Sequence, residues 1–174
     1  ELPGGNSRIA VFNENGEYKH QWRLHRDEDD DRIELPHCLR ISNDGLVYVC
    51  DRRADRIQVF DKQGELQQII TAPHTPLSDT ANREAGIRGD AVVLDFSADA
   101  EQRYLYVVNQ NSVTVEVLDR ISGEWITRFG EGPGRYPGQF ELPHGIGVDS
   151  DGNVYIAEQE GRRVQRFLLQ HHTP

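Results

Sequence analysis

Two long segments of this chain repeat each other residue by residue. Glu34–Cys50, ELPHCLRISNDGLVYVC, aligns without a gap with Glu141–Ala157, ELPHGIGVDSDGNVYIA, and the agreement continues in Arg56–Phe60 and Arg163–Phe167. Repetition of this length constrains the fold more than any single motif does, because each copy must form the same supersecondary unit and pack against its neighbours.

A partial copy and a degraded copy accompany these two. Arg8–Tyr18 lines up with Arg56–Leu66, and four short apolar runs preserve the pattern of one complete unit; these runs are Val92–Phe96, Tyr104–Val108, Val113–Leu118 and Glu124–Phe129. We assign the whole chain, residues 1–174, to a single domain whose units lie at residues 7–23, 34–70, 91–130 and 141–168.

Each complete copy has the pattern of four short β-strands separated by turns. In the unit at residues 34–70, Leu39 and Ile41 alternate with other residues, which is the period-2 pattern of a strand. Gly45 supplies the positive φ of a tight hairpin, and Val47 and Val49 form the matching apolar face of the next strand. A recurring four-stranded antiparallel unit is typical of a β-propeller blade. We therefore predict an all-β fold, a partial propeller of about three and a quarter blades, rather than a β-sandwich with coincidental repetition.

The number of units is smaller than a closed propeller requires. Propellers carry about four to eight blades, and an open arc leaves two blade faces bare. Three arrangements stay open at this point: a piece of a longer protein, a homo-oligomer whose chains close one ring, or a partner chain that supplies the missing blades.

Charge and hydropathy restrict the partners of the chain. The formal net charge is −10 and no basic cluster stands out. Affinity for nucleic acid depends on Lys and Arg that neutralise phosphates, so we expect no nucleic-acid partner. No stretch approaches the roughly 20 apolar residues that span a bilayer, so we expect no membrane partner and a soluble chain, with secretion or a periplasmic location left open.

The amino-acid sequence of the repeat resembles the NHL repeat, most clearly in Pro137–Ala157 followed by Arg163–Phe167. Within NHL proteins the chain is most similar to peptidyl-α-hydroxyglycine α-amidating lyase and its bacterial relatives. The residues that carry this similarity are Gly5–Ile9, Leu35–His37, Asp51–Arg52 with Arg56–Gln58 downstream, and Leu142–His144. Their order and spacing suit the second half of that six-bladed family.

This resemblance implies a zinc ion in the central channel, bound by three histidines from different blades. His37 and His144 occupy two of the three positions, and the third ligand is expected upstream of the first residue of this chain. Arg52 matches a family arginine that faces the substrate. Two positions differ from the family, because Gly4 stands where the catalytic tyrosine is expected and Leu142 stands where a methionine is expected.

The residues themselves also favour a metal site. His37 and His144 take the same place in two copies, and first strands of blades run along the channel, so equivalent side chains converge on its axis. Imidazole suits zinc, and a zinc site with three protein ligands keeps one position open for substrate. The competing interpretation is that each Pro-His only ends a connection between blades, with its imidazole bonded to backbone, and that Arg52 is a solvated surface charge.

Arginines also recur at the start of the third strand of three copies, as Arg8, Arg56 and Arg163. We expect them to be structural and to pair with a carboxylate between blades. Two further segments carry weaker hypotheses. The five acids Asp27–Asp31 are either a calcium site or, more simply, a solvated loop, and residues 71–90 form either a lid over the channel mouth or a disordered loop.

Cys38 and Cys50 lie directly opposite each other if Leu39 faces Val49 across the hairpin. That spacing is compatible with a disulfide and equally with two thiols. A metal cluster of the two cysteines with His37 is a weaker alternative.

Two classes of function follow, and whether the chain is an enzyme stays open. The first is a zinc-dependent lyase that cleaves the carbon–nitrogen bond of a peptidyl-α-hydroxyglycine or a similar small-molecule substrate. In it His37, His144 and the missing histidine hold zinc, and Arg52 orients the substrate carboxylate. The alternative is a non-catalytic NHL propeller that binds a protein or small ligand. A lactonase-like hydrolase comes third, because it needs channel carboxylates and no convincing set is present.

Overall fold

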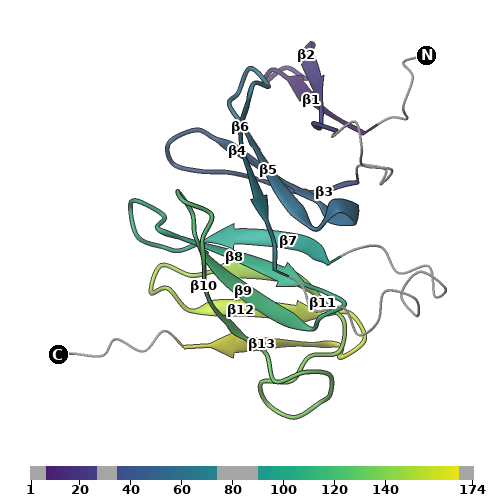
Figure 1. The fold of residues 1–174 in the computed structure, drawn as a ribbon, viewed down its shortest axis with the longest axis vertical. Coiled ribbons are helices and arrows are strands. Elements are labelled where there is room, and N and C mark those ends of the chain that lie inside the picture. Colours follow the sequence, from purple (N-terminus) through teal and green to yellow (C-terminus); the bar gives the residue numbers. More distant parts are fainter. Residues whose placement is uncertain (1–6, 27–34, 74–89, 169–174) are drawn as a thin grey trace.

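The computed structural model describes residues 7–26, 35–73 and 90–168, and in these residues the chain is almost entirely β-structure (Figure 1). In the described ranges thirteen strands form four antiparallel sheets of two, four, four and three strands in the order of the chain, with one short 3-10 helix, η1 (Arg52–Ala54). The predicted all-β partial propeller is confirmed, since these sheets amount to about three and a quarter blades of four strands.

We number the sheets as blades 1 to 4 along the chain. Blade 1 holds β1 (Arg8–Phe12) and β2 (Tyr18–Arg23); blade 2 holds β3 (Pro36–Ile41), β4 (Val47–Asp51), β5 (Arg56–Phe60) and β6 (Leu66–Thr71). Blade 3 holds β7 (Ala91–Phe96), β8 (Tyr104–Asn109), β9 (Thr114–Asp119) and β10 (Trp125–Phe129); blade 4 holds β11 (Pro143–Val148), β12 (Val154–Glu158) and β13 (Arg163–Phe167). Each strand pairs with the next one in the sequence.

Local sequence explains the hairpins of each blade. Leu39 pairs with Val49 and Ile41 with Val47, as the alternation predicts, and Gly45 closes the turn at a φ of 87°. The sequence-based end of the fourth strand of blade 2 was wrong. Thr71, which the pattern assigned to a long loop, is the last residue of β6 because its neighbour Ala72 donates to the carbonyl of Asp55 and holds the chain at the edge of β5.

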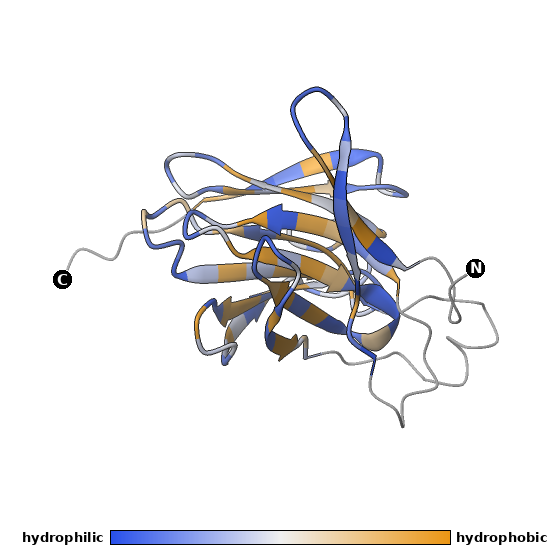
Figure 2. Ribbon diagram, turned by 90° about the horizontal axis from the view of Figure 1, so that it is seen from above, coloured by the Kyte–Doolittle hydropathy of each residue, from blue (hydrophilic) through white to orange (hydrophobic). Residues whose placement is uncertain are grey.

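The core lies between the blades rather than within them. One apolar cluster joins blades 2 and 3, a second joins blades 3 and 4, and a third joins blade 2 to Trp22 and Ile9 of blade 1. Strands β4 and β5 are buried along their whole length because both of their faces meet a neighbouring blade. Seen from above, the sheets lie in a stack with apolar residues along the strands and polar loops at the ends (Figure 2).

The first strands of the blades lie closest together, as β3 contacts β7 and β7 contacts β11. This is the arrangement of strands around a propeller channel. Apolar side chains also remain exposed at the two ends of the described arc, with Phe12 and Tyr18 on blade 1 and Val164 on blade 4.

Three sequence-based hypotheses fall wholly or mostly outside the described residues. They concern Gly4, the acidic run Asp27–Asp31, and residues 74–89 of the long segment after blade 2. Within the described ranges, no helix is long and apolar enough to cross a membrane.

Candidate functional site

A β-bulge at the same place in three blades positions the candidate site. The pairing between the first and second strand skips one residue in each blade, and the skipped residues are His37 of β3, Val92 of β7 and His144 of β11. A bulged residue is left out of the ladder, and the bulge turns its side chain away from the direction that the regular pleat would give. The three positions are therefore equivalent in backbone as well as in sequence.

His37 and His144 meet although a whole blade separates them in the sequence. Their ring centroids are 5.4 Å apart and the ring planes are inclined by 67°. His37 is half-buried and His144 is exposed. The structure thus brings together the two predicted metal ligands, one from blade 2 and one from blade 4, beside the first strand of blade 3.

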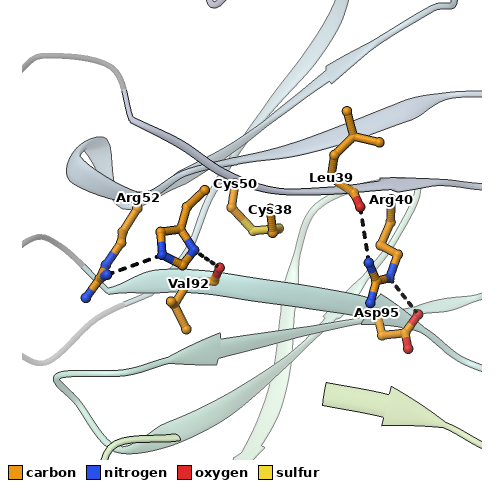
Figure 3. Close-up of a disulfide and its surroundings, with 8 residues drawn as sticks. Cys38, Leu39, Arg40, Cys50, Arg52, Val92 and Asp95 are labelled. Atoms are coloured by element: carbon orange, nitrogen blue, oxygen red, sulfur yellow. Dashed lines mark hydrogen bonds and ion pairs between the residues drawn. A yellow bond between two sulfur atoms is a disulfide. The ribbon is translucent and has the colours of Figure 1, made fainter. Parts of the chain in front are cut away.

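The imidazole of His37 is held in one orientation by the backbone of blade 3. Its Nδ1 lies 2.7 Å from the carbonyl oxygen of Val92 (Figure 3). A carbonyl only accepts, so Nδ1 carries the proton and Nε2 of the neutral ring keeps its lone pair. Metal-binding histidines usually have this arrangement, in which one ring nitrogen donates to a carbonyl and the other is left for the metal.

Arg52 lies beside Nε2 of His37 and is tied to blade 3. It follows β4 directly, is half-buried, and its Nη1 is 3.5 Å from Nε2 of His37 (Figure 3). Its Nη2 donates to Oε1 of Gln110, and Nε2 of Gln110 in turn donates to the carbonyl of Pro143 at 3.3 Å. The guanidinium is therefore fixed across three blades and is not a freely solvated charge.

Sequence reasoning missed Gln110 and Val92. Both stand in the degraded copy, where Asn109-Gln110 occupies the position of Asp51-Arg52. Extending the alignment of repeats into that copy would have placed Gln110 next to Arg52 around the channel, because equivalent residues of neighbouring blades lie side by side.

Burial lowers the pKa of His37 below its ordinary value of 6.5, and the charges of Arg52 and His144 act in the same direction, whereas the bond to Val92 opposes them. Just below pH 6.5, His37 is therefore protonated to a greater extent in the unfolded chain than in the folded chain. In the window between the folded pKa and 6.5, the free energy of unfolding should rise with pH. Urea unfolding at several pH values from 5 to 7.5 should show this slope in the parent and a weaker slope in His37→Gln; equal slopes would contradict it.

The donor set fits two ligands of a zinc site. Among the residues that the structure describes, no group of three or more His, Cys, Asp and Glu side chains could hold a metal ion. The weaker hypothesis of a Cys-Cys-His cluster is wrong, because Cys38 and Cys50, paired across the hairpin as predicted, are joined in a disulfide (Figure 3). A disulfide has no thiolate to offer a metal. The two imidazoles remain, and Nε2 of His37, which now lies 3.5 Å from Nη1 of Arg52, is the nitrogen that a metal would use.

Two of the recurrent arginines, Arg56 and Arg163, have the structural role that the repeat predicted. Arg56 Nε donates to Asp51 at 3.0 Å and Arg163 Nε donates to Glu158 at 2.7 Å. The expectation that the carboxylate belongs to another blade was wrong, since in both cases it ends the second strand of the same blade. The carboxylate faces the arginine directly across the hairpin, at Asp51↔Arg56 and Glu158↔Arg163.

Comparison with known proteins agrees with this geometry. The NHL repeat is recognised at residues 35–60 and 140–167. The chain therefore carries NHL repeats within a β-propeller fold. It is similar to peptidyl-glycine alpha-amidating monooxygenase B of Xenopus laevis, with 31% identity over 93% of this chain, and it spans only 18% of that protein.

Two solved structures illustrate the fold. Virginiamycin B lyase of Staphylococcus aureus superposes with a TM-score of 0.60 over 95% of this chain and 50% of its own, at 15% identity. The WD40 beta propeller domain of Doa1 does so with a TM-score of 0.59 over 90% of this chain and 42% of its own, at 9% identity. The chain thus spans about half of each structure, and these likenesses establish the propeller fold alone.

Proposed function

We propose that this chain carries part of the active site of a zinc-dependent lyase that acts on peptidyl-α-hydroxyglycine-type substrates. The contact between the His37 and His144 rings carries the proposal, since two imidazoles from equivalent positions of different blades meet at 5.4 Å. Similarity to an amidating monooxygenase over 93% of the chain supports the choice of substrate class. Zinc, when bound, would act as a Lewis acid on the substrate hydroxyl.

Each described residue has a defined part in this scheme. His37 offers Nε2 to the metal because Val92 holds its Nδ1 proton. In the structure the lone pair of that nitrogen faces Nη1 of Arg52. A metal bound at Nε2 would take over this lone pair, and the Nη1 donor of Arg52 would then be available to the substrate. A guanidinium recognises a carboxylate through paired N–H donors, so Arg52 would orient the carboxylate of the substrate while Gln110 holds its other end.

The reaction itself is a redistribution within the substrate. The hydroxyl proton leaves, the carbon–oxygen bond becomes a carbonyl, and the carbon–nitrogen bond breaks with its electron pair on nitrogen, which takes up a proton. The products are an amide and glyoxylate. The base for the first proton is not among the residues assigned here, and the position of the family tyrosine, Gly4, lies outside the described residues.

Zinc titration tests the proposal. The parent for this experiment carries His171→Ser and His172→Ser, so that the pair His171-His172 does not contribute to the zinc affinity that is measured. In that parent, His37→Ala and His144→Ala should each weaken zinc binding by at least about tenfold, measured by competition with a chromophoric chelator. His20→Ala is the matched control, because its ring bonds to the carbonyl of Lys62 on blade 2, and it should leave the affinity unchanged.

The outcome separates this proposal from the non-catalytic propeller. If His37→Ala and His144→Ala bind zinc as tightly as the parent, the metal proposal is wrong. The scaffold alternative rests on two observations: Arg52 already shares the lone pair of His37, and the described residues supply no third ligand. Glyoxylate release from an N-acyl-α-hydroxyglycine, lost on Arg52→Ala, would in contrast favour the lyase.

Ring closure by a second copy or a partner chain is likewise a proposal, which the mass in solution tests.

A further inference from the structure

An open groove of about 920 Å³ lies between blades 3 and 4, at the opposite end of the first strands from the histidine pair. Its walls are the β7–β8 connection and the β11–β12 turn. The polar residues that line it include Asp99, Glu101, Arg103 and Tyr106 on blade 3 and Asp151 and Asn153 on blade 4. Three carboxylates and one guanidinium line it, so the groove is acidic.

The corresponding place between blades 2 and 3 is filled. Arg120, which follows β9, reaches back to blade 2 and is only 4% exposed. Its Nη1 lies 3.0 Å from a carboxylate oxygen of Asp44 and 3.1 Å from the hydroxyl of Tyr48. Its Nε donates to the carbonyl of Gln102 at 2.8 Å. The carboxylate of Asp44 and the hydroxyl of Tyr48, both on blade 2, thus together bind one guanidinium group.

Blade 3 carries the same receptor pair. Tyr106 takes the position of Tyr48, since the two pair with equivalent residues of β7 and β3. Asp99 corresponds to Asp44, because each carboxylate accepts from the serine two residues before it, at the end of the first strand. The repeat therefore places the acid and the phenol of the Arg120 site a second time, in the groove between blades 3 and 4.

In this second copy no guanidinium of the described residues bonds to both Asp99 and Tyr106. Tyr106 is 7% exposed, and in the described part of the chain its hydroxyl has no hydrogen-bond partner although it lines the groove. Arg103 does not take this place, because its guanidinium carbon lies 5.5 Å from the ring centroid of the neighbouring Tyr104. The body of the phenol is buried while its hydroxyl opens into the groove, so a ligand that enters the groove can bond to it.

We propose that this groove binds the arginine side chain of a partner polypeptide, with Asp99 and Tyr106 as its receptors. The charge of the groove suits a cation, and the planar guanidinium is the group that the same two residue types hold in the first copy. The proposal is independent of the histidine pair and of zinc.

The test uses N-acetylarginine amide as the probe, titrated into the ¹⁵N-labelled chain. Amide shifts should be confined to residues 97–106 and 150–153, with a dissociation constant of order 1 mM, as befits a single side chain. Tyr106→Phe and Asp99→Asn should each weaken binding roughly tenfold, and the citrulline analogue, which has no charge, should not bind.

Tyr155→Phe is the matched control, because Tyr155 holds the same repeat position in blade 4 but its hydroxyl already donates to Asp149 at 3.0 Å. It should leave the affinity unchanged. The absence of shifts in the groove, or shifts that persist at the same concentrations in both Tyr106→Phe and Asp99→Asn, would overturn the proposal. The amide spectrum of each variant shows at the same time that it is folded.

Discussion

Replacing Asp51 by alanine should lower the free energy of unfolding by about 3–5 kcal/mol. The carboxylate is fully buried at the end of β4. It accepts from Arg56 Nε at 3.0 Å, from Gln58 Nε2 at 3.0 Å and from the amide of Leu35 at 2.9 Å. Without it a buried guanidinium loses its counter-charge, which is far more costly than the loss of one hydrogen bond. Urea unfolding at neutral pH measures the difference.

Blade 4 provides the control for this prediction. Glu158 takes the position of Asp51 in blade 4 and accepts from the equivalent residues there, from Arg163 at 2.7 Å and from Gln165 at 2.8 Å. The Arg163 side chain is 28% exposed, so water can take over part of its solvation, and Glu158→Ala should cost distinctly less than Asp51→Ala. Equal losses in the two variants, or a loss below about 1 kcal/mol for Asp51→Ala, would contradict the assigned cause.

Arg120→Leu should lower the free energy of unfolding by about 3 kcal/mol. The side chain joins blades 2 and 3 through Asp44 and Tyr48, and it also donates to the carbonyls of Gln102 and Glu101 at 2.8 and 3.0 Å. Leucine fills part of the volume but leaves these acceptors and a buried phenol without a donor. Thermal and urea unfolding should agree on the loss.

Arg128→Leu is the matched control for Arg120→Leu. Arg128 pairs with Glu116 at 3.6 Å, but its side chain is 41% exposed, and such pairs contribute at most about 1 kcal/mol. A similar loss for both variants would mean that burial and bonding across the blades do not distinguish Arg120.

The sequence alone predicted the backbone of the blades well. Period-2 alternation and turn glycines are local signals, so the pairing of Leu39 with Val49 and the bounds of β5 followed from the repeat. Equivalence between copies also brought His37 and His144 to one place, since blades arranged around an axis superpose equivalent positions.

The contacts between blades could not be predicted in the same way. Arg120 looks like an ordinary basic residue beside a turn, yet it bonds to Tyr48, 72 positions earlier in the chain. Gln110 and Val92 stand in the copy that has diverged most, so their link to Arg52 and His37 carried no motif. Side chains of this kind depend on the order and inclination of whole sheets, which no local pattern encodes.

The inclination between neighbouring blades has a consequence for the histidine pair. Blades around a channel are closest together at their innermost strands and farther apart at their outer strands. The His37 ring of blade 2 and the His144 ring of blade 4 therefore meet at 5.4 Å although the whole sheet of blade 3 stands between the two blades. If a blade swings through a small angle about its innermost strand, each atom moves in proportion to its distance from that pivot. The histidines lie close to the pivot and the outer strands lie far from it. Substitutions at the periphery can therefore loosen the molecule considerably while the separation of the two imidazoles hardly changes.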